Sequence, residues 1–427
     1  MTAPTQKQKI AVIGSGVAGM TSAWLLNKEY DVHLFEKNDY LGGHTRTLKV
    51  ETGADAGTPV DTGYIVMNHR NYPNFTKVLE ELEVPVADST MSFSYFDQAS
   101  NYGYAGNGLS GLFPSPSYLL KTHHLKFIRD LWRFARLGYA DLQSGFLDGK
   151  TLDAYCCERN FSVYFRERYL YPMGAAIWSS PVAQLKQFPA QPYLHFLENH
   201  GLLRLHNRPQ WKYIPGGSRT YIERIRDTLK HIPETNLAAQ AIERQTDSVI
   251  VHLSNGTQQN FDQAVIATHA DQALELLQNP TPAEHKLLSP WRYQENTVTL
   301  HTDNTQLPKN KKLWSAWNFV RSDEDTEQRP VSVTYHMNQL QRIQSETPYL
   351  VTLNQDGAIS PSKILNSTTL THPLYDFDSL ATQSRLTQNN GTDRIWFCGS
   401  YFGYGFHEDA VKSAVQVASK LGIEWSA

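Results

Sequence analysis

The sequence has few cysteines, and their number and spacing exclude two classes of site. Among its 427 residues only Cys156, Cys157 and Cys398 are cysteines. Neighbouring cysteines rarely bridge each other and three is an odd number, so the sequence predicts no disulfide framework. No Cys-x-x-Cys pair and no histidine–cysteine group has the spacing of a metal site. We therefore expect no metal.

Long hydrophobic runs and an excess of charge of either sign are also missing. No segment approaches the ~20 apolar residues of a membrane-spanning helix, and the polar opening MTAPTQKQK lacks the apolar stretch of a signal peptide. A formal net charge of −3 provides no overall field for nucleic acid. We expect a cytoplasmic protein without a nucleic-acid partner, and the sequence leaves the oligomeric state open.

The chain as a whole is rich in aromatic residues and poor in charged ones. Charged residues make up 19% of the chain and aromatic residues 11%, including nine tryptophans. The length suits two domains. The aromatic excess fits a large apolar cavity or simply a large core, and composition alone favours the core.

The stretch from Lys9 to Glu36 has the pattern of a βαβ dinucleotide-binding unit. An apolar run ends in Gly14-Ser15-Gly16-Val17-Ala18-Gly19, a helical pattern reaches about Asn27, and a second strand, residues 31–35, leads to Glu36. The glycines permit a tight turn, close approach of a pyrophosphate and close helix packing. Glu36 has the spacing of a carboxylate that bonds ribose hydroxyls, which disfavours NADP.

A second glycine pair follows the βαβ unit. Gly42, Gly43 and Thr47 resemble the Gly-Gly-Arg-x-x-Thr segment of the flavin amine oxidase and phytoene desaturase superfamily. His44 stands where that family has Arg, and Arg46 is the candidate to replace the missing pyrophosphate contact. The resemblance implies FAD, bound non-covalently.

Other segments resemble the same superfamily in the same order. Asp61-Thr62-Gly63 is similar to a step whose backbone lies beside the flavin ring, although a plain turn has the same pattern. The segments AAQAIERQ, SVIVHLSNG and FDQAVIATHA (residues 261–270) predict a β-meander, with Asn255-Gly256 as a hairpin turn. Residues 240–242, centred on Ala241, lie in its first strand and correspond to a strand that meets the adenine. His269 either faces the cofactor or caps a strand end, which is the commoner outcome.

The C-terminus carries the last match. A strand ending in Gly399-Ser400 and a helix from about Glu408 resemble the motif that contacts the ribityl chain and directs a helix N-terminus at the flavin. Ser400 replaces the usual acid, and Cys398 is expected in the core. The residues that the resemblance assigns to FAD are Gly14, Gly16, Val17, Ala18, Gly19, Glu36, Lys37, Gly42, Gly43, His44, Thr45, Asp61, Thr62, Gly63, Ala241, Gly399, Ser400, Gly405, Phe406, His407 and Glu408.

Two segments between these motifs predict a substrate domain. Residues 93–109 predict a hairpin over a cavity, and four alternating segments from Trp291 to about Leu353 predict an antiparallel sheet that floors it. The catalytic residues are unknown, and the candidates are Tyr335, His336, His372 and His407.

A helix from about Tyr118 to Asp141 carries a basic stripe of Lys126, Arg129, Arg133 and Arg136. Such a helix either lies on an anionic bilayer or is a surface helix with its apolar face in the core, and the second interpretation is favoured. The localisation is thus cytoplasmic, with peripheral contact at the inner face of the membrane left open.

The sequence therefore predicts an α/β fold: a Rossmann-type FAD-binding domain (1–90, 210–290 and 385–427) with an inserted α+β substrate domain (91–209 and 291–384). The segments ATHADQAL, VTYHMNQLQ and YGFHEDAVKSA resemble a bacterial group of FAD-binding oxidoreductases encoded beside cyclopropane-fatty-acid-synthase-like methyltransferases.

This resemblance implies hydride transfer from an apolar, acyl or lipid substrate to flavin N5, as in a dehydrogenase or desaturase. The alternatives are a flavin amine oxidase and a flavin-binding protein with a redox-neutral or partner-dependent role. The substrate, the electron acceptor and the base stay open.

Overall fold

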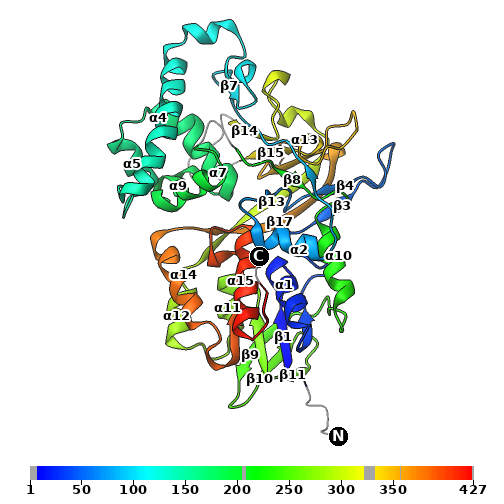
Figure 1. Cartoon of the computed structure of the whole chain (residues 1–427). Coiled ribbons are helices and arrows are strands. Elements are labelled where there is room, and N and C mark those ends of the chain that lie inside the picture. The colour runs from blue at the N-terminus through cyan, green and yellow to red at the C-terminus, as the bar shows by residue number, and fades with distance from the viewer. Residues whose placement is uncertain (1–6, 204–207, 322–331, 356, 426–427) are drawn as a thin grey trace.

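The computed structural model describes residues 7–203, 208–321, 332–355 and 357–425. The chain forms two halves, one above the other in Figure 1. A small parallel sheet organises the lower half and a larger mixed sheet the upper half. The N-terminal βαβ unit and the C-terminal helix lie together in the lower half, so the chain leaves this half and returns to it.

The parallel sheet confirms the predicted βαβ unit. Helix α1 (Val17–Leu26) connects β1 (Lys9–Ile13) to β2 (Asp31–Phe35). The strand order is β18-β12-β1-β2, completed by β12 (Gln263–Ile266) and β18 (Ile395–Phe397). Burial drives this arrangement, because the apolar side chains of the central strands β1 and β12 are excluded from water on both faces.

A three-stranded antiparallel meander lies beside the parallel sheet. It consists of β9 (Ala239–Arg244), β10 (Val249–Leu253) and β11 (Gln258–Phe261). The sequence pattern placed 261–270 in this meander, and this was wrong: β12 pairs with β1 in parallel instead. The fully buried run Ala264–Ile266 suits a central strand, whereas the polar β11 suits an edge.

The helices of the lower half cover both sheets. Helices α1 and α15 pack against each other, and α10 and α2 contact them. These elements are α2 (Pro73–Glu81), α10 (Arg219–Thr228), α11 (Ala270–Leu276), α12 (Pro282–Leu288), α14 (Phe377–Asn389) and α15 (His407–Lys420).

Seven strands form the sheet of the upper half, in the order β17-β13-β16-β15-β14-β6-β7. All neighbours are antiparallel except β14 and β6. The strands are β6 (Phe93–Asp97), β7 (Tyr102–Ala105), β13 (Arg292–His301), β14 (Trp317–Arg321), β15 (Val333–His336), β16 (Leu350–Leu353) and β17 (Ile364–Leu374). This confirms the predicted antiparallel segments and the 93–105 hairpin, and it adds β17.

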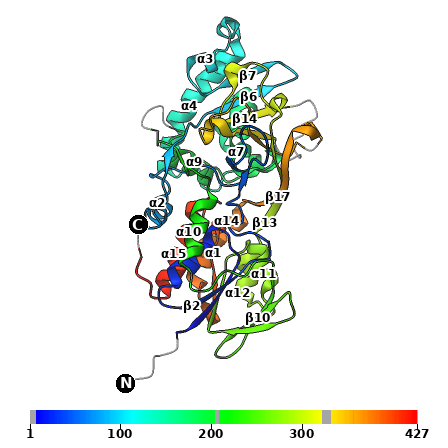
Figure 2. The same cartoon turned by 90° about the vertical axis from the view of Figure 1, so that its right-hand side faces the viewer.

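Helices gather on one side of the upper half (Figure 2). The predicted 118–141 helix divides into the 3₁₀ turn η1 (Pro116–Leu120) and the long helix α4 (Thr122–Ser144). The others are α3 (Leu109–Leu112), α5 (Leu152–Glu158), α6 (Val163–Phe165), α7 (Tyr171–Trp178), α8 (Val182–Gln187) and α9 (Ala190–Asn199).

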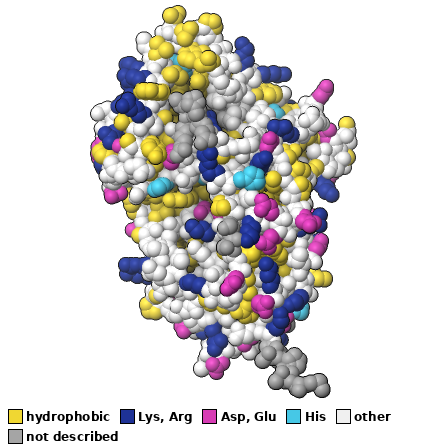
Figure 3. Space-filling view, viewed as in Figure 1, with side chains coloured by type: hydrophobic (Ala, Val, Ile, Leu, Met, Phe, Trp, Pro, Cys, Tyr) yellow, Lys and Arg dark blue, Asp and Glu magenta, His cyan; other side chains and the backbone are white. Residues whose placement is uncertain are grey.

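Short elements connect the halves. Strands β3 (Thr47–Lys49) and β4 (Pro59–Asp61) form one ribbon, and β5 (Ala87–Asp88) and β8 (Lys212–Tyr213) form another. Helix α13 (Met337–Leu340) follows β15. Within the described ranges, no helix combines the length and hydrophobicity needed to cross a bilayer. Figure 3 shows hydrophobic side chains gathered at the top of the molecule.

Candidate functional site

One large cavity lies between the two halves. Its volume is about 810 Å³, and its walls come from the loops after β1, β2, β12 and β18 on one side and from β13, β14, β15, β16 and β17 on the other. In open α/β sheets, ligands bind beyond the carboxyl ends of the strands. The first end of the cavity, at the loops after the parallel strands, therefore has the position of a nucleotide-binding site, and the strands of the large sheet line the second end.

The glycine motif shapes the first end of this cavity. Gly14 has a φ of +94°, and a Cβ on Gly19 would lie 1.9 Å from the Gly14 carbonyl oxygen, so Gly19 serves helix packing. Gly16 lines the cavity, and a Cβ built on it meets no atom within 4 Å. Gly16 precedes α1 without a side-chain cap, so the amide groups of the first turn of α1 are available to phosphates.

Glu36 lies at the same end. Its Oε2 accepts hydrogen bonds from the Ser15 N–H (2.9 Å) and the Ser15 hydroxyl (2.6 Å), and its Oε1 accepts from the Asn38 N–H (2.9 Å) and amide (2.7 Å). This network holds the carboxylate at the cavity wall, and the Ser15 hydroxyl is a rotatable donor that a ribose hydroxyl can replace.

The second glycine pair and Thr62-Gly63 form the next part of the wall. Gly42 and Gly43 have φ values of +111° and +57°. A Cβ on Gly63 would lie 2.0 Å from the His44 carbonyl oxygen, so two chain segments pass in direct contact here. Arg46 is not among the lining residues; its guanidinium lies over the Tyr40 ring at 5.4 Å, which corrects its expected contact with a pyrophosphate.

Asp61, which was assigned to the cofactor site, is fully buried and does not line the cavity, unlike its neighbours Thr62 and Gly63. The Asp61 carboxylate accepts hydrogen bonds from the Thr47 hydroxyl (2.5 Å), the Ser218 N–H (2.9 Å) and hydroxyl (2.8 Å), and the Gln341 amide (2.9 Å). Burial raises its pKa to about 6, and these hydrogen bonds oppose the shift. Asp61 thus connects β4 with the loop before α10 and with α13.

We expect Asp61→Ala to lower the free energy of unfolding by about 3 kcal/mol or more, because it leaves several buried donors without an acceptor. Asp61→Asn should cost less, since an amide oxygen still accepts. Urea unfolding measures both. Asp247→Ala is the control, because that side chain is 91% exposed and its loss should change stability by less than about 0.5 kcal/mol. A stable Asp61→Ala protein would contradict this role.

The C-terminal motif closes the cavity. Gly399, Ser400, Gly405, Phe406 and His407 all line it, and α15 begins at His407, so its positive N-terminal end faces the cavity. Cys398, in contrast, is fully buried, is not a lining residue and lies 3.5 Å from the Ser22 hydroxyl.

His407 is a buried, hydrogen-bonded ring. It stacks on Tyr64 with centroids 3.5 Å apart, and its Nε2 lies 3.1 Å from the Thr45 hydroxyl and 3.0 Å from the Tyr221 hydroxyl. Burial lowers its pKa well below the usual value, so the ring is neutral. Thr45 itself does not line the cavity and reaches it only through this contact.

Two further assigned residues lie outside the cavity. The Glu408 carboxylate accepts hydrogen bonds from the Asn74 and Phe75 N–H groups (3.1 and 3.0 Å), so it joins α15 to the start of α2. Ala241 is not a lining residue, because the wall there is formed by Ala238, Ala239 and Gln240. The remaining assigned residues, Val17, Ala18, Lys37, Gly43 and His44, line the cavity, and their contacts with a cofactor stay a prediction.

Three histidines from distant segments meet in the middle of the cavity. The His44 ring lies 5.3 Å from His372 and 6.0 Å from His269, and all three line the cavity. Burial lowers the pKa of His269 and of His372 to about 3 and also lowers that of His44, so the rings are neutral. His44 and His372 were among the assigned or candidate residues, and His269, for which a strand-end cap was the favoured interpretation, lines the cavity as well. No sequence signal joined the three.

Hydrogen bonds fix the protonation of two of these rings. His44 Nε2 donates to the Thr371 carbonyl oxygen (3.1 Å), which leaves Nδ1 as the nitrogen with a free lone pair. The Asn296 amide nitrogen lies 3.1 Å from His372 Nδ1 and donates to it, so His372 carries its proton on Nε2. His372 is therefore a hydrogen-bond donor toward the cavity, and His44 Nδ1 is an acceptor.

Of the candidates on β15, only Tyr335 reaches the cavity. Its hydroxyl donates to the Ala176 carbonyl oxygen at 3.4 Å, and its ring packs edge-on against Trp317. His336 points to the opposite face of the sheet, as alternate strand residues do, and lies near Trp314 instead. The candidacy of His336 as a cavity residue is therefore wrong.

The second end of the cavity is apolar. Its wall includes Ile177, Trp178, Phe196, Trp317 and Leu370. The only carboxylates among the described lining residues are Glu36 and Glu275, and both belong to the nucleotide half. The hairpin predicted over residues 93–109 to cover the cavity forms as β6 and β7, but it contributes no lining residue, because it forms the far edge of the large sheet.

A smaller, polar cavity of about 540 Å³ adjoins the first. The two share Tyr72, Phe196, His200 and Phe406, of which Phe196 stacks on both His200 (3.8 Å) and Phe406 (4.6 Å). Its wall carries Arg70 and Lys412 together with acidic side chains. The smaller cavity is thus a polar space next to the large cavity, and the stacked rings of Phe196 and Phe406, here called the Phe196–Phe406 partition, lie between the two.

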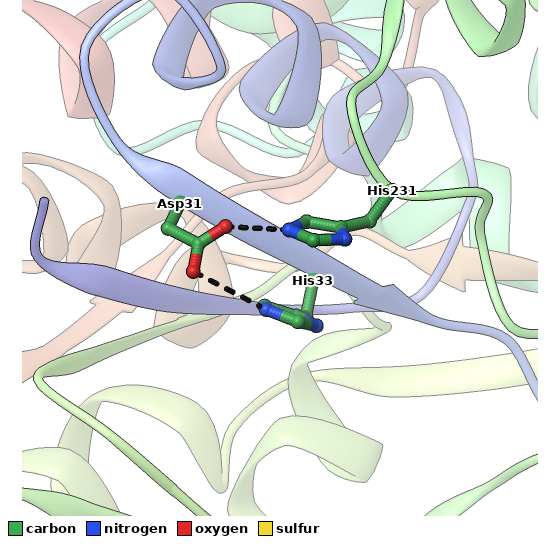
Figure 4. A group of neighbouring side chains, drawn as sticks. All are labelled: Asp31, His33 and His231. Atoms are coloured by element: carbon green, nitrogen blue, oxygen red, sulfur yellow. Dashed lines mark hydrogen bonds and ion pairs between the residues drawn. The ribbon is translucent and has the colours of Figure 1, made fainter.

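The structure also brings together three side chains with metal-ligand chemistry, which the sequence analysis did not foresee. His231 Nε2 lies 2.5 Å and His33 Nε2 3.7 Å from the two oxygens of Asp31, at the surface end of β2 (Figure 4). The two rings are stacked, with centroids 4.3 Å apart and planes 19° apart. Each ring directs one nitrogen at a different oxygen of the Asp31 carboxylate, and the three groups do not surround a common point. The carboxylate therefore bridges the two rings as a hydrogen-bond acceptor.

Comparisons with known proteins give a family and solved structures of the same fold. The family model for flavin containing amine oxidoreductases matches residues 17–421. A search of curated protein sequences found no match. Among solved structures, the CLA-producing fatty acid isomerase from P. acnes superposes with a TM-score of 0.70 at 13% identity, over 99% of this chain and 100% of that one.

Two amine oxidases have the same fold. A putrescine oxidase bound to putrescine gives a TM-score of 0.69 at 14% identity, over 98% of this chain and 99% of the other. The cyclohexylamine oxidase from Brevibacterium oxydans gives 0.65 at 16% identity, over 97% and 99%. The family match and the dinucleotide-binding geometry lead to one conclusion: this chain belongs to the flavin-containing amine oxidoreductase family and is an FAD-dependent oxidoreductase.

Proposed function

We propose that this oxidoreductase acts on an apolar, acyl-type substrate and removes hydrogen from it as a dehydrogenase or desaturase. The observation that carries the proposal is the second end of the cavity, whose described wall consists mainly of aromatic and aliphatic side chains and has no carboxylate to hold an ammonium group. An alkyl chain gains about 25 cal/mol for each Å² that it buries against such a wall.

FAD, when bound, supplies a two-electron acceptor for a hydride from the substrate. The residues that would hold it are those of the first end: Gly16 and the α1 N-terminus for the phosphates, Glu36 for the ribose and the α15 N-terminus for negative charge on the ring. Non-covalent binding of FAD stays part of the proposal.

The chain's own residues handle the proton that accompanies the hydride. Removal of a hydride and a proton from adjacent carbons leaves a carbon–carbon double bond. His44 Nδ1 is neutral and has a free lone pair, so we propose it as the group that accepts this proton, while His372 orients a polar atom of the substrate. The aromatic walls exclude water, which protects the reduced state from side reactions.

The smaller cavity suits the polar end of such a substrate. It lies beyond the Phe196–Phe406 partition, so a chain lying in the large cavity could keep its head group near Arg70 and Lys412. An amine oxidase remains the second candidate, because acidic side chains also line the smaller cavity.

The test is anaerobic reduction of the bound flavin, followed as loss of its absorbance. We expect bleaching by fatty acids or bacterial phospholipid extract and none by mixed amines. Ile177→Trp should keep FAD but lower the rate of bleaching by long chains at least tenfold, because the new ring fills the apolar end. Val163→Trp, at a position 60% exposed, is the matched control and should bleach like the native protein.

Other outcomes reject either the substrate class or the proposed reaction. Bleaching by amines alone, with release of hydrogen peroxide in air, would assign an amine oxidase. Double-bond migration in a fatty acid without net bleaching would assign a redox-neutral role, the activity named for the P. acnes isomerase that shares this fold. Absence of both reactions in an FAD-loaded protein would leave a partner-dependent role.

A further inference from the structure

The top of the upper half exposes large apolar side chains in two neighbouring elements. Leu109 of α3 is 77% exposed, and Leu119 and Leu120 of η1 are 59% and 85% exposed. Turn η1 leads into α4 and contacts it. In Figure 3 the top of the molecule carries a hydrophobic patch with Lys and Arg side chains on both sides of it.

Helix α4 extends this surface. Leu125, Trp132 and Tyr139 are 44%, 56% and 49% exposed. They are seven residues apart, so they form one stripe along the helix. Arg129 and Arg136 fall between them and are exposed too. The opposite stripe, with Phe127, Asp130, Phe134 and Asp141, is buried in the upper half. The buried stripe is that of a surface helix with its apolar face in the core, and the exposed stripe is the face that is left for a partner.

The charge of this region is strongly one-sided, although the whole chain is slightly acidic. Residues 98–140 contain five lysines and arginines and a single acid, Asp130. Asp130 is fully buried and paired with Arg129 and Arg133, so it offsets one of the five positive charges and leaves the region with a net positive charge. Turn η4 (Lys311–Leu313), which contacts α3, adds the exposed Lys311 and Lys312.

We propose that the surface formed by α3, η1 and the exposed stripe of α4 docks on an anionic lipid bilayer. Leucine side chains would enter the acyl boundary, Trp132 and Tyr139 would lie at the head-group level, and the lysines and arginines would face anionic phosphates. This docking deepens the proposed function, since it places the enzyme at the source of an acyl substrate. It does not depend on which lipid reacts.

The test is co-flotation of the FAD-loaded protein with vesicles. We expect binding to vesicles rich in phosphatidylglycerol, at least tenfold weaker binding to pure phosphatidylcholine, and release by high salt. The double variant Arg129→Gln/Arg136→Gln should bind the anionic vesicles about 10- to 30-fold more weakly. The triple variant Leu119→Ser/Leu120→Ser/Trp132→Ser should also detach, because it removes the apolar anchors.

The matched control is Arg224→Gln/Arg385→Gln, which removes two exposed arginines from α10 and α14. It should bind anionic vesicles like the native protein, and all variants should keep FAD and reduction by detergent-dispersed substrate. Equal binding by the control and by Arg129→Gln/Arg136→Gln would overturn the proposal, as would native protein that does not float. A lipid-free dimer dissociated by the triple variant would overturn it too, since a second copy would then cover the surface. None of these results would affect the flavin reduction test.

Discussion

A Gly16→Leu variant is expected to purify as a folded protein that has lost at least nine-tenths of its FAD. Gly16 lines the cavity, and a side chain built on it enters open space rather than a packed core. Its φ of −57° suits any residue, so the substitution causes no backbone strain. The new side chain would occupy the space in front of the α1 N-terminus, where the phosphates are held.

The ratio of flavin absorbance to protein absorbance measures this loss, and a thermal unfolding curve of the FAD-free protein shows that the fold is intact. Gly106→Leu is the control, because Gly106 is exposed and its Cβ would lie 3.5 Å from the nearest atom, an ordinary contact. Full FAD occupancy in Gly16→Leu would contradict the position of the dinucleotide.

The second large effect is a loss of stability on mild acidification. Burial lowers the pKa of His124, His200 and His301 to about 4 and that of His269 and His372 to about 3. In the unfolded chain these groups take up protons near pH 6.5, whereas the folded protein keeps them neutral. The unfolded state therefore binds more protons, and the free energy of unfolding falls as the pH drops below about 6.5.

Two carboxyl groups oppose this trend. Burial raises the pKa of Asp61 and of Asp409 to about 6, so their protonation stabilises the fold as the pH falls from about 6 toward 4. The five histidines outnumber them. We expect a net loss of roughly 2–4 kcal/mol per pH unit between pH 6.5 and 5.5, measured by urea unfolding of the FAD-free protein.

One substitution isolates the contribution of a single histidine to this slope. His301→Asn should reduce it by about 1.4 kcal/mol per pH unit at most, because one titrating group outside the cavity is gone. His285→Asn, at an exposed position, should leave the slope unchanged. A free energy of unfolding that stays constant or rises on acidification would contradict the neutral state of the buried histidines.

Features of the site that depend on neighbouring residues in the chain could be predicted. The βαβ unit around Gly14–Gly19, Glu36 at the end of β2 and the glycines 42–43 and 399 all line or shape the cavity. These positions have a local cause: a turn, a close backbone approach or a helix start allows few residue types, and the same types recur at fixed spacing. The family of the chain follows from them.

Features that depend on which segments meet could not be predicted. Sequence periodicity placed β12 in the meander, although its pairing with β1 decides its sheet. The family resemblance gave Asp61 and Glu408 a cofactor role, whereas both carboxylates hold distant segments together. Sequence reasoning also selected both Tyr335 and His336, but these neighbours lie on opposite faces of β15 and only Tyr335 lines the cavity.

The sequence by itself thus determined that this protein binds a dinucleotide cofactor in an α/β domain, because those constraints act within about 30 residues. Only the tertiary structure decided the meeting of His44, His269 and His372, the uncharged wall at the second end of the cavity and the exposure of apolar side chains on α3 and η1. Each of these depends on contacts or burial between segments up to 328 residues apart, and such contacts leave no mark on the spacing of neighbouring residues.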